Sequence, residues 1–250
     1  MCGKLLASWR IPPPAIWGKL PGHADFVRSG MRHGELEAWM PWLAQQSRNA
    51  GADVSARAVA VPVAFVLPPG TLAFAKRRFV LGVIAPSIDK VERHHPLLIY
   101  QQAQPRWVGR HFEAQLEQPL DWQFWLARAV ARHTRAQGRT DIRALETTVR
   151  ALWREQTHAA GVTWKGGDRT EEDLAGQRAR RMQALLDRWA GPAPANDPAA
   201  QLHGVRYLPW ADWPQRLHDV RAESAFWQQD AEGRFIGAAN KLQKLWGRPA

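Results

Sequence analysis

The stretch from Leu81 to Tyr100 constrains the fold most, because two apolar, β-prone runs flank a short polar connection. The first run is 80–84 and the second is 97–100. Pro86 and Pro96 bracket the polar part, and proline ends strands because it has no N–H for the ladder. The pattern therefore predicts a strand, an ordered loop and a second strand.

The predicted loop carries a dense set of polar side chains between two buried strands. Function tends to lie on loops that rigid elements position, so this loop is the first candidate for a functional site. We interpret Asp89 and Arg93 as an ion pair that stiffens the turn, since structural ion pairs outnumber catalytic ones. The polar residues of the loop are Ser87, Asp89, Lys90, Glu92, Arg93, His94 and His95.

Apolar runs elsewhere in the first hundred residues predict an antiparallel meander of about four or five strands. The run 58–67 contains Pro62, which favours an edge strand or a bulge. Leu36, Trp39, Met40 and Leu43 recur at helical spacing, with Pro41 predicting a kink or a late helix start. The predicted strands are 15–20, 58–67, 71–75, 78–85 and 97–103, with 71–75 and 78–85 forming a hairpin that turns at Lys76 and Arg77, and the predicted helix is 35–48.

The second half of the sequence is mainly helical in pattern. Three apolar stripes predict helices over 122–130, 142–153 and 174–189, and Gly191 stands where the last helix should stop. The remaining predictions are strands at 205–208 and 225–229, a helix at 212–221, a turn at 230–233 with a return arm at 234–237, and a last helical turn at 241–246.

We expect one domain over residues 1–250, of the α/β class, with a central antiparallel sheet of about five strands packed by helices. The expected parts are a sheet-containing core at 15–120, a helical part at 121–190, an Ala/Pro linker at 191–200, and strands and short helices at 201–250.

Net charge and composition limit the partners. A formal charge of +11 permits nucleic acid, an anionic membrane or an acidic protein as partner. The charges are scattered and interleaved with acidic residues, so we expect a solvated basic surface and no nucleic-acid partner. The single cysteine, Cys2, cannot form an intrachain disulfide, and no apolar run approaches the roughly 20 residues of a membrane span. We expect a cytoplasmic protein with no membrane insertion.

The known catalytic and nucleotide-binding motifs are absent from the sequence: there is no P-loop, GxGxxG, GxSxG or HExxH pattern. His94 and His95 are adjacent on a loop and lack a spaced third metal ligand. We expect no catalytic residue, no metal and no cofactor. The alternative is a regulatory domain that binds a small ligand or nucleotide, with Lys19 and Arg93 on its phosphate.

Two segments carry a resemblance to the TagF (ImpM) family. The first, Gly18 to Arg28, resembles the pattern G-K-L-P-x-x-G-D-F-V-x-R. The second, Pro86 to Leu97, resembles P-S-x-D-x-V-G-R-x-F-P-L. Between them, 39–43 resembles W-D-x-W-L and 62–70 resembles P-x-x-F-x-L-x-P-G. The sequence differs from these patterns at Ala24 (usually Gly), Met40 (Asp), Glu92 (Gly) and His95 (Phe).

The resemblance implies a bacterial accessory protein of type VI secretion without catalytic activity. It implies a cytoplasmic factor that represses assembly or firing after translation, by binding the forkhead-associated scaffold protein Fha or another component. The implied fold is an α/β sandwich similar to longin and signal-receptor domains. The implied partner-binding or structural residues are Gly18, Lys19, Leu20, Pro21, Asp25, Phe26, Arg28, Pro86, Ser87, Asp89, Arg93 and Pro96.

Overall fold

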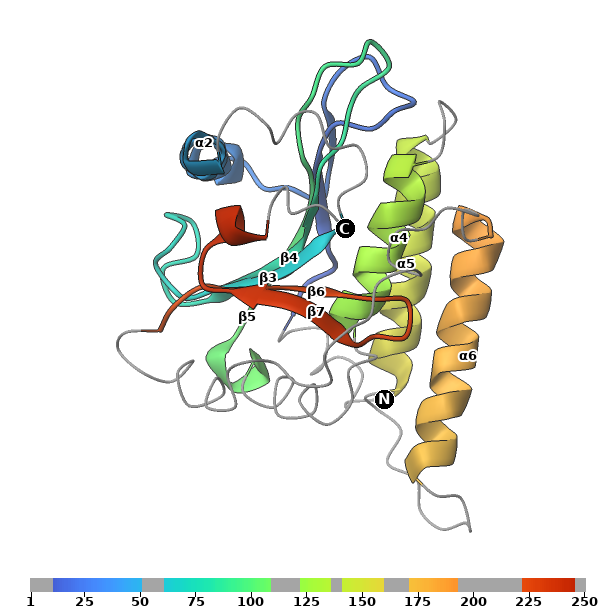
Figure 1. The fold of residues 1–250 in the computed structure, drawn as a ribbon. Coiled ribbons are helices and arrows are strands. Elements are labelled where there is room, and N and C mark those ends of the chain that lie inside the picture. Colours follow the sequence, from blue (N-terminus) through green and yellow to red (C-terminus); the bar gives the residue numbers. More distant parts are fainter. Residues whose placement is uncertain are drawn as a thin grey trace.

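The fold is that of a computed structural model, which describes residues 11–50, 61–108, 122–135, 141–159, 171–192 and 222–245. It belongs to the α/β class, as predicted, with one antiparallel sheet and helices against both faces (Figure 1). No helix in these ranges is long and apolar enough to cross a membrane.

Seven strands form the sheet, in the order β2-β1-β5-β4-β3-β6-β7. Each pair of neighbours is antiparallel, and β3, β4 and β5 follow one another as a meander. The strands are β1 (Ala15–Gly18), β2 (Val27–Ser29), β3 (Val63–Leu67), β4 (Phe79–Ala85), β5 (Leu97–Ala103), β6 (Ala225–Gln229) and β7 (Phe235–Ala239).

Both faces of the sheet are buried, which explains why its central strands read as continuous apolar runs. In β4, Leu81 and Val83 belong to one hydrophobic cluster, whereas Val80 and Ile84 belong to the other. This alternation is the two-residue period of a strand. The core is therefore two layers of side chains separated by the sheet.

Three helices lie on the side of the first face: α4 (Trp122–Arg135) packs on β3 and β4, and α5 (Ile142–Ala159) and α6 (Glu171–Ala190) pack against α4 and each other. They confirm the three stripes of the sequence, and Gly191, with φ of +77°, follows α6 in the left-handed conformation of a helix stop. The second face is covered by α2 (Glu35–Ala50) and the short 3₁₀ helix η2 (Leu242–Lys244).

The structure corrects three predictions in the first hundred residues. Residues 71–75 form turns, not a strand, because the amide of Ala75 bonds the Leu72 carbonyl and both side chains are buried. Pro62 precedes β3, which lies between β4 and β6 rather than at an edge. Helix α2 starts at Glu35 and runs through Pro41, so the prediction of a late start is wrong.

The strand count is also higher than the five predicted. The sequence pattern does not predict β2, which has three residues. The predicted C-terminal hairpin is present, and it extends the sheet through pairing of β6 with β3. The sheet therefore reaches beyond the expected 15–120 core. The predictions for 205–208 and 212–221 lie outside the described residues.

Candidate functional site

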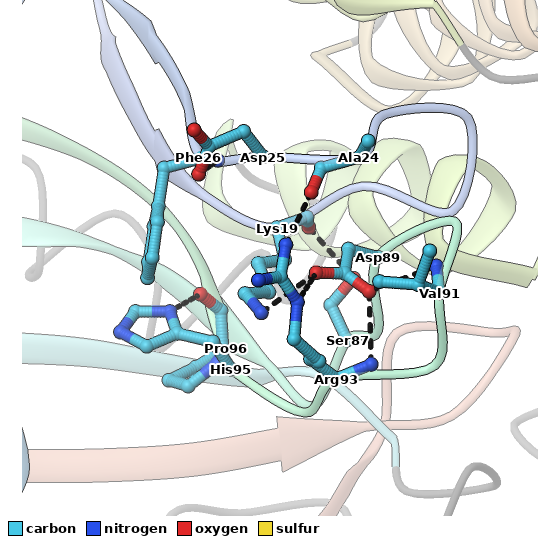
Figure 2. Close-up of polar contacts among 10 residues, drawn as sticks. All are labelled: Lys19, Ala24, Asp25, Phe26, Ser87, Asp89, Val91, Arg93, His95 and Pro96. Atoms are coloured by element: carbon cyan, nitrogen blue, oxygen red, sulfur yellow. Dashed lines mark hydrogen bonds and ion pairs between the residues drawn. The ribbon is translucent and has the colours of Figure 1, made fainter.

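A five-residue turn, Asp89 to Arg93, is the centre of the candidate site (Figure 2). The Asp89 carboxylate accepts hydrogen bonds from the amides of Val91 (3.0 Å) and Arg93 (2.8 Å) through Oδ1. Its other oxygen, Oδ2, accepts one from Arg93 Nε (2.7 Å). The Asp89 amide donates to the Arg93 carbonyl (3.1 Å), which closes the turn. The predicted Asp89–Arg93 pair is thus present and holds the turn.

Glu92 occupies a backbone position that favours glycine. Its φ is +63°, and it is the one residue other than glycine with positive φ among those described. A side chain in the left-handed region costs about 1 kcal/mol or more. This conformation explains why the family pattern has glycine here, and it makes Glu92 a point of strain in the turn.

Lys19 joins this turn to the first signature segment. Its Nζ lies 2.8 Å from Asp89 Oδ2, and both side chains are buried, with 7% and 0% exposed. The Ser87 hydroxyl donates to the Lys19 carbonyl (2.7 Å). A buried charge is tolerated when it is paired and hydrogen-bonded, and this pair meets both conditions. The two segments are therefore locked together from inside.

Further contacts between the segments involve the backbone. Arg93 Nη2 donates to the Ala24 carbonyl, and the Lys90 amide donates to the His23 carbonyl (2.8 Å). Gly18 has φ of +139°, and a Cβ there would lie 2.1 Å from the carbonyl oxygen of Pro96. Only glycine permits this approach. The segments lie side by side at the top of Figure 1.

An aromatic group lies beside the ion pair. The His95 ring packs edge-on against Trp17 (4.9 Å between centroids) and Phe26 (4.6 Å). Lys19 Nζ lies 5.3 Å from the centre of the Phe26 ring. His95 stands where the family pattern has phenylalanine, and its imidazole occupies an aromatic position. Phe26 remains 46% exposed and Val91 58% exposed, so the site presents apolar surface.

Electrostatics favour a fixed arrangement of charges. Burial opposes ionisation of Asp89, but hydrogen bonds from Lys19, Arg93 and the turn amides outweigh it and hold the Asp89 pKa well below its usual range. Burial lowers the pKa of His95, and the Lys19 charge adds to that effect. Asp89 is therefore a permanent anion at neutral pH, and His95 is held neutral.

The structure thus brings most of the signature residues together, in different roles. Leu20 is fully buried in the core, Ser87 and Asp89 are buried, and Phe26 is exposed. Asp25 accepts a hydrogen bond from the amide of its neighbour Phe26 (2.8 Å). Arg28 is exposed in β2. Lys19 and Arg93, which the alternative prediction places on a ligand phosphate, both bind the Asp89 carboxylate instead.

The predicted turn at 230–233 is present, but sequence reasoning missed that it is held by the same aspartate–arginine arrangement. Asp230 binds the amides of Glu232 (3.0 Å) and Arg234 (2.9 Å) through Oδ1, and Arg234 Nε (2.8 Å) through Oδ2. The shared spacing is an aspartate followed four residues later by an arginine, with positive φ at the fourth of the five residues, Glu92 or Gly233. That spacing was visible in the sequence.

Comparisons with known proteins agree with the signature segments. The family model for the TagF N-terminal domain, described as type VI secretion system-associated, matches residues 15–152. Three chains among the solved structures match as well. One is the crystal structure of PA0076 from Pseudomonas aeruginosa PAO1, with 18% sequence identity, a TM-score of 0.48, and coverage of 94% of this chain and 92% of that one. The search of curated proteins gave no match.

The family match places the protein among those associated with bacterial type VI secretion systems. Within that class, the chain belongs to the TagF family, whose N-terminal domain it contains. The resemblance drawn from the signature segments is confirmed, and the match extends past them to residue 152, in helix α5.

Proposed function

We propose that this protein is a non-enzymatic, cytoplasmic repressor of a type VI secretion system, which acts after translation by binding a scaffold component of the machine. The partner expected from the family is the forkhead-associated protein Fha. The proposed contact surface, called the signature surface here, consists of residues 18–28 and 86–96. Binding there would withhold the scaffold from assembly.

One observation carries this proposal: exposed apolar side chains stand on a rigid, cross-linked base. Phe26 and Val91 are 46% and 58% exposed, while Lys19 and Asp89 beneath them form a buried ion pair. Interfaces gain most from apolar anchors that need little ordering on binding. The signature surface has that construction, with Arg93 and Lys90 exposed beside the apolar groups.

The charged groups in this surface support binding more readily than catalysis. Lys19 and Arg93 neutralise Asp89, and the Ser87 hydroxyl donates to a backbone carbonyl. A nucleophile needs a general base within hydrogen-bond reach, and the hydrogen bond described for Ser87 runs to that carbonyl instead. We therefore propose a protein-binding role for the surface.

The test is co-purification of the scaffold with this protein and with two surface variants, Val91→Asp and Phe26→Ser. Both positions are exposed, so the variants should fold. The matched control is Met40→Ser, which changes a side chain of similar exposure (56%) on helix α2. We expect the two signature variants to lose the scaffold and to release secretion in cells, whereas the control keeps both binding and repression.

Full repression by Val91→Asp and Phe26→Ser would contradict the assignment of the surface. Failure of the unmodified protein to bind any secretion component would contradict the proposed function itself. A salt series separates a specific complex from general attraction to the +11 charge, because nonspecific electrostatic binding falls steeply with salt.

A further inference from the structure

The β1–β2 hairpin has the signature surface at one end and a cavity of about 290 Å³ at the other. The signature segment 18–28 includes the loop that joins the two strands, whereas the cavity lies where β1 begins and β2 ends, beside Ile16 and Ser29. Helix α5 forms another wall. The volume of the cavity is near the lower bound for ligand pockets in proteins, roughly 300 Å³.

Three arginines from three separate parts of the fold line this cavity. Arg32 precedes α2, Arg78 precedes β4, and Arg150 lies on α5. Among the described residues, no carboxylate forms an ion pair with any of the three guanidinium groups. Other arginines of the fold are paired, as Arg132 is with Asp187 at 2.6 Å. An accumulation of unpaired guanidinium groups around a cavity favours a bound anion.

The lining of the cavity includes a buried, hydrogen-bonded carboxylate. Glu35, 4% exposed, accepts hydrogen bonds from the Tyr100 hydroxyl (2.6 Å), the Gln102 side chain (2.8 Å) and the Arg32 amide (3.1 Å). These three donors hold the Glu35 carboxylate in place. Apolar groups, among them Pro13 and Val149, complete the walls.

We propose that this cavity binds a small organic phosphate, with Arg32, Arg78 and Arg150 on the phosphate and the apolar walls against the organic part. Guanidinium groups match phosphate geometry with paired N–H donors. A dianionic phosphate also suits three cations better than a single carboxylate does. Glu146, half-buried in the lining one helical turn before Arg150, is the acidic group that opposes the ligand.

The test is titration of the intact 250-residue chain with phenyl phosphate, monitored by calorimetry and by amide NMR shifts. Inorganic phosphate and benzoate are the comparison probes, at constant ionic strength. We expect saturable binding with shifts at Ser29 and Val149. Phenyl phosphate should bind more tightly than inorganic phosphate, because the ring adds apolar contact, and more tightly than benzoate, because of its charge.

The variants use a matched pair in one turn. Arg78→Gln removes a lining guanidinium, whereas Arg77→Gln removes an equal charge from the exposed neighbour, which is not in the lining. We expect Arg78→Gln to lower the affinity for phenyl phosphate by about tenfold and Arg77→Gln to lower it by less than about twofold. Glu146→Gln should tighten binding, since it removes the opposing charge.

Equal weakening by Arg77→Gln and Arg78→Gln would overturn the site, because binding would then follow net charge alone. The absence of saturable binding by any probe would overturn it too. Benzoate binding as tightly as phenyl phosphate would overturn the assignment to phosphates. These outcomes are independent of scaffold binding, because Arg78 lies outside both signature segments.

Discussion

The turns Asp89–Arg93 and Asp230–Arg234 are built from the same hydrogen bonds, yet they occur in different settings. Each aspartate is buried, binds two amides through one oxygen and binds the arginine Nε through the other. The first turn also receives Lys19 from a distant segment, and it has Glu92 where the second has Gly233. The shared part is therefore a structural device.

The difference separates the part of the family signature that is a common turn from the part that the proposed function uses. A turn used twice in one fold cannot by itself define a partner site. What sets the first turn apart is its attachment to residues 18–26 through Lys19 and Arg93, with the Phe26 ring packed against His95. The following predictions separate the shared turn from that attachment.

Gly18→Ala should have the largest effect on stability. The new Cβ would meet the carbonyl oxygen of Pro96 at 2.1 Å, in a backbone conformation that suits glycine. We expect the melting temperature to fall by roughly 15 °C. Gly237→Ala, near the second turn, is the control, because its Cβ would meet only side-chain ends, Leu245 Cδ2 at 3.1 Å and Gln228 Oε1 at 3.7 Å. A similar loss in both variants would show that close packing at Gly18 is not the cause.

Asp89→Ala should be more damaging than Asp230→Ala. Both substitutions remove the aspartate bonds of a turn, but the first also leaves the Lys19 ammonium buried without its partner. We expect falls in melting temperature of roughly 10 °C and roughly 5 °C respectively. The double variant Lys19→Met with Asp89→Ala should recover part of the difference. Equal losses in the two single variants would mean that Lys19 contributes little.

The contribution of Asp89 to the free energy of unfolding should depend on pH and should be lost in acid. Its pKa in the folded protein lies below the ordinary value of 3.8, so its contribution is complete above that pH and is lost as the pH falls further. We expect urea unfolding to show wild type more stable than Asp89→Asn at pH 7. The gap should narrow below about pH 4, where Asp89 of the unfolded chain takes up a proton, and should close only at lower pH, where the folded carboxylate is protonated as well. A gap that stays constant with pH would contradict the ion-pair interpretation.

Substitution of the fourth turn residue should change the melting temperature least, and in opposite directions in the two turns. Glu92→Gly removes the strain of a side chain at positive φ and should raise the melting temperature by about 1–2 °C. Gly233→Ala introduces that strain and should lower it by about 3 °C. Val91→Gly is the control, because Val91 does not have positive φ. Stabilisation by Val91→Gly as well would show that the turn conformation is not the source.

The sequence predicted the secondary structure best where apolar periodicity was clear and, for the strands, where prolines marked the ends. The runs flanking the 86–96 loop became β4 and β5, and the helical stripes became α4, α5 and α6. Residues 71–75 misled because their apolar side chains serve the core from a turn, which a short alternating pattern does not distinguish from a strand. Long-range contacts could not be predicted, because nothing in the local sequence indicates that Lys19 forms an ion pair with Asp89.

The pairing of β3 with β6 has a consequence for synthesis of the chain. Val66 pairs with Ala225, so one edge of β3 has no partner strand until the distant β6 segment has been synthesised. Closing so long a loop is entropically costly and slow. Until then, the unpaired N–H and C=O groups along that edge of β3 are open to other strands, which favours aggregation of the nascent chain.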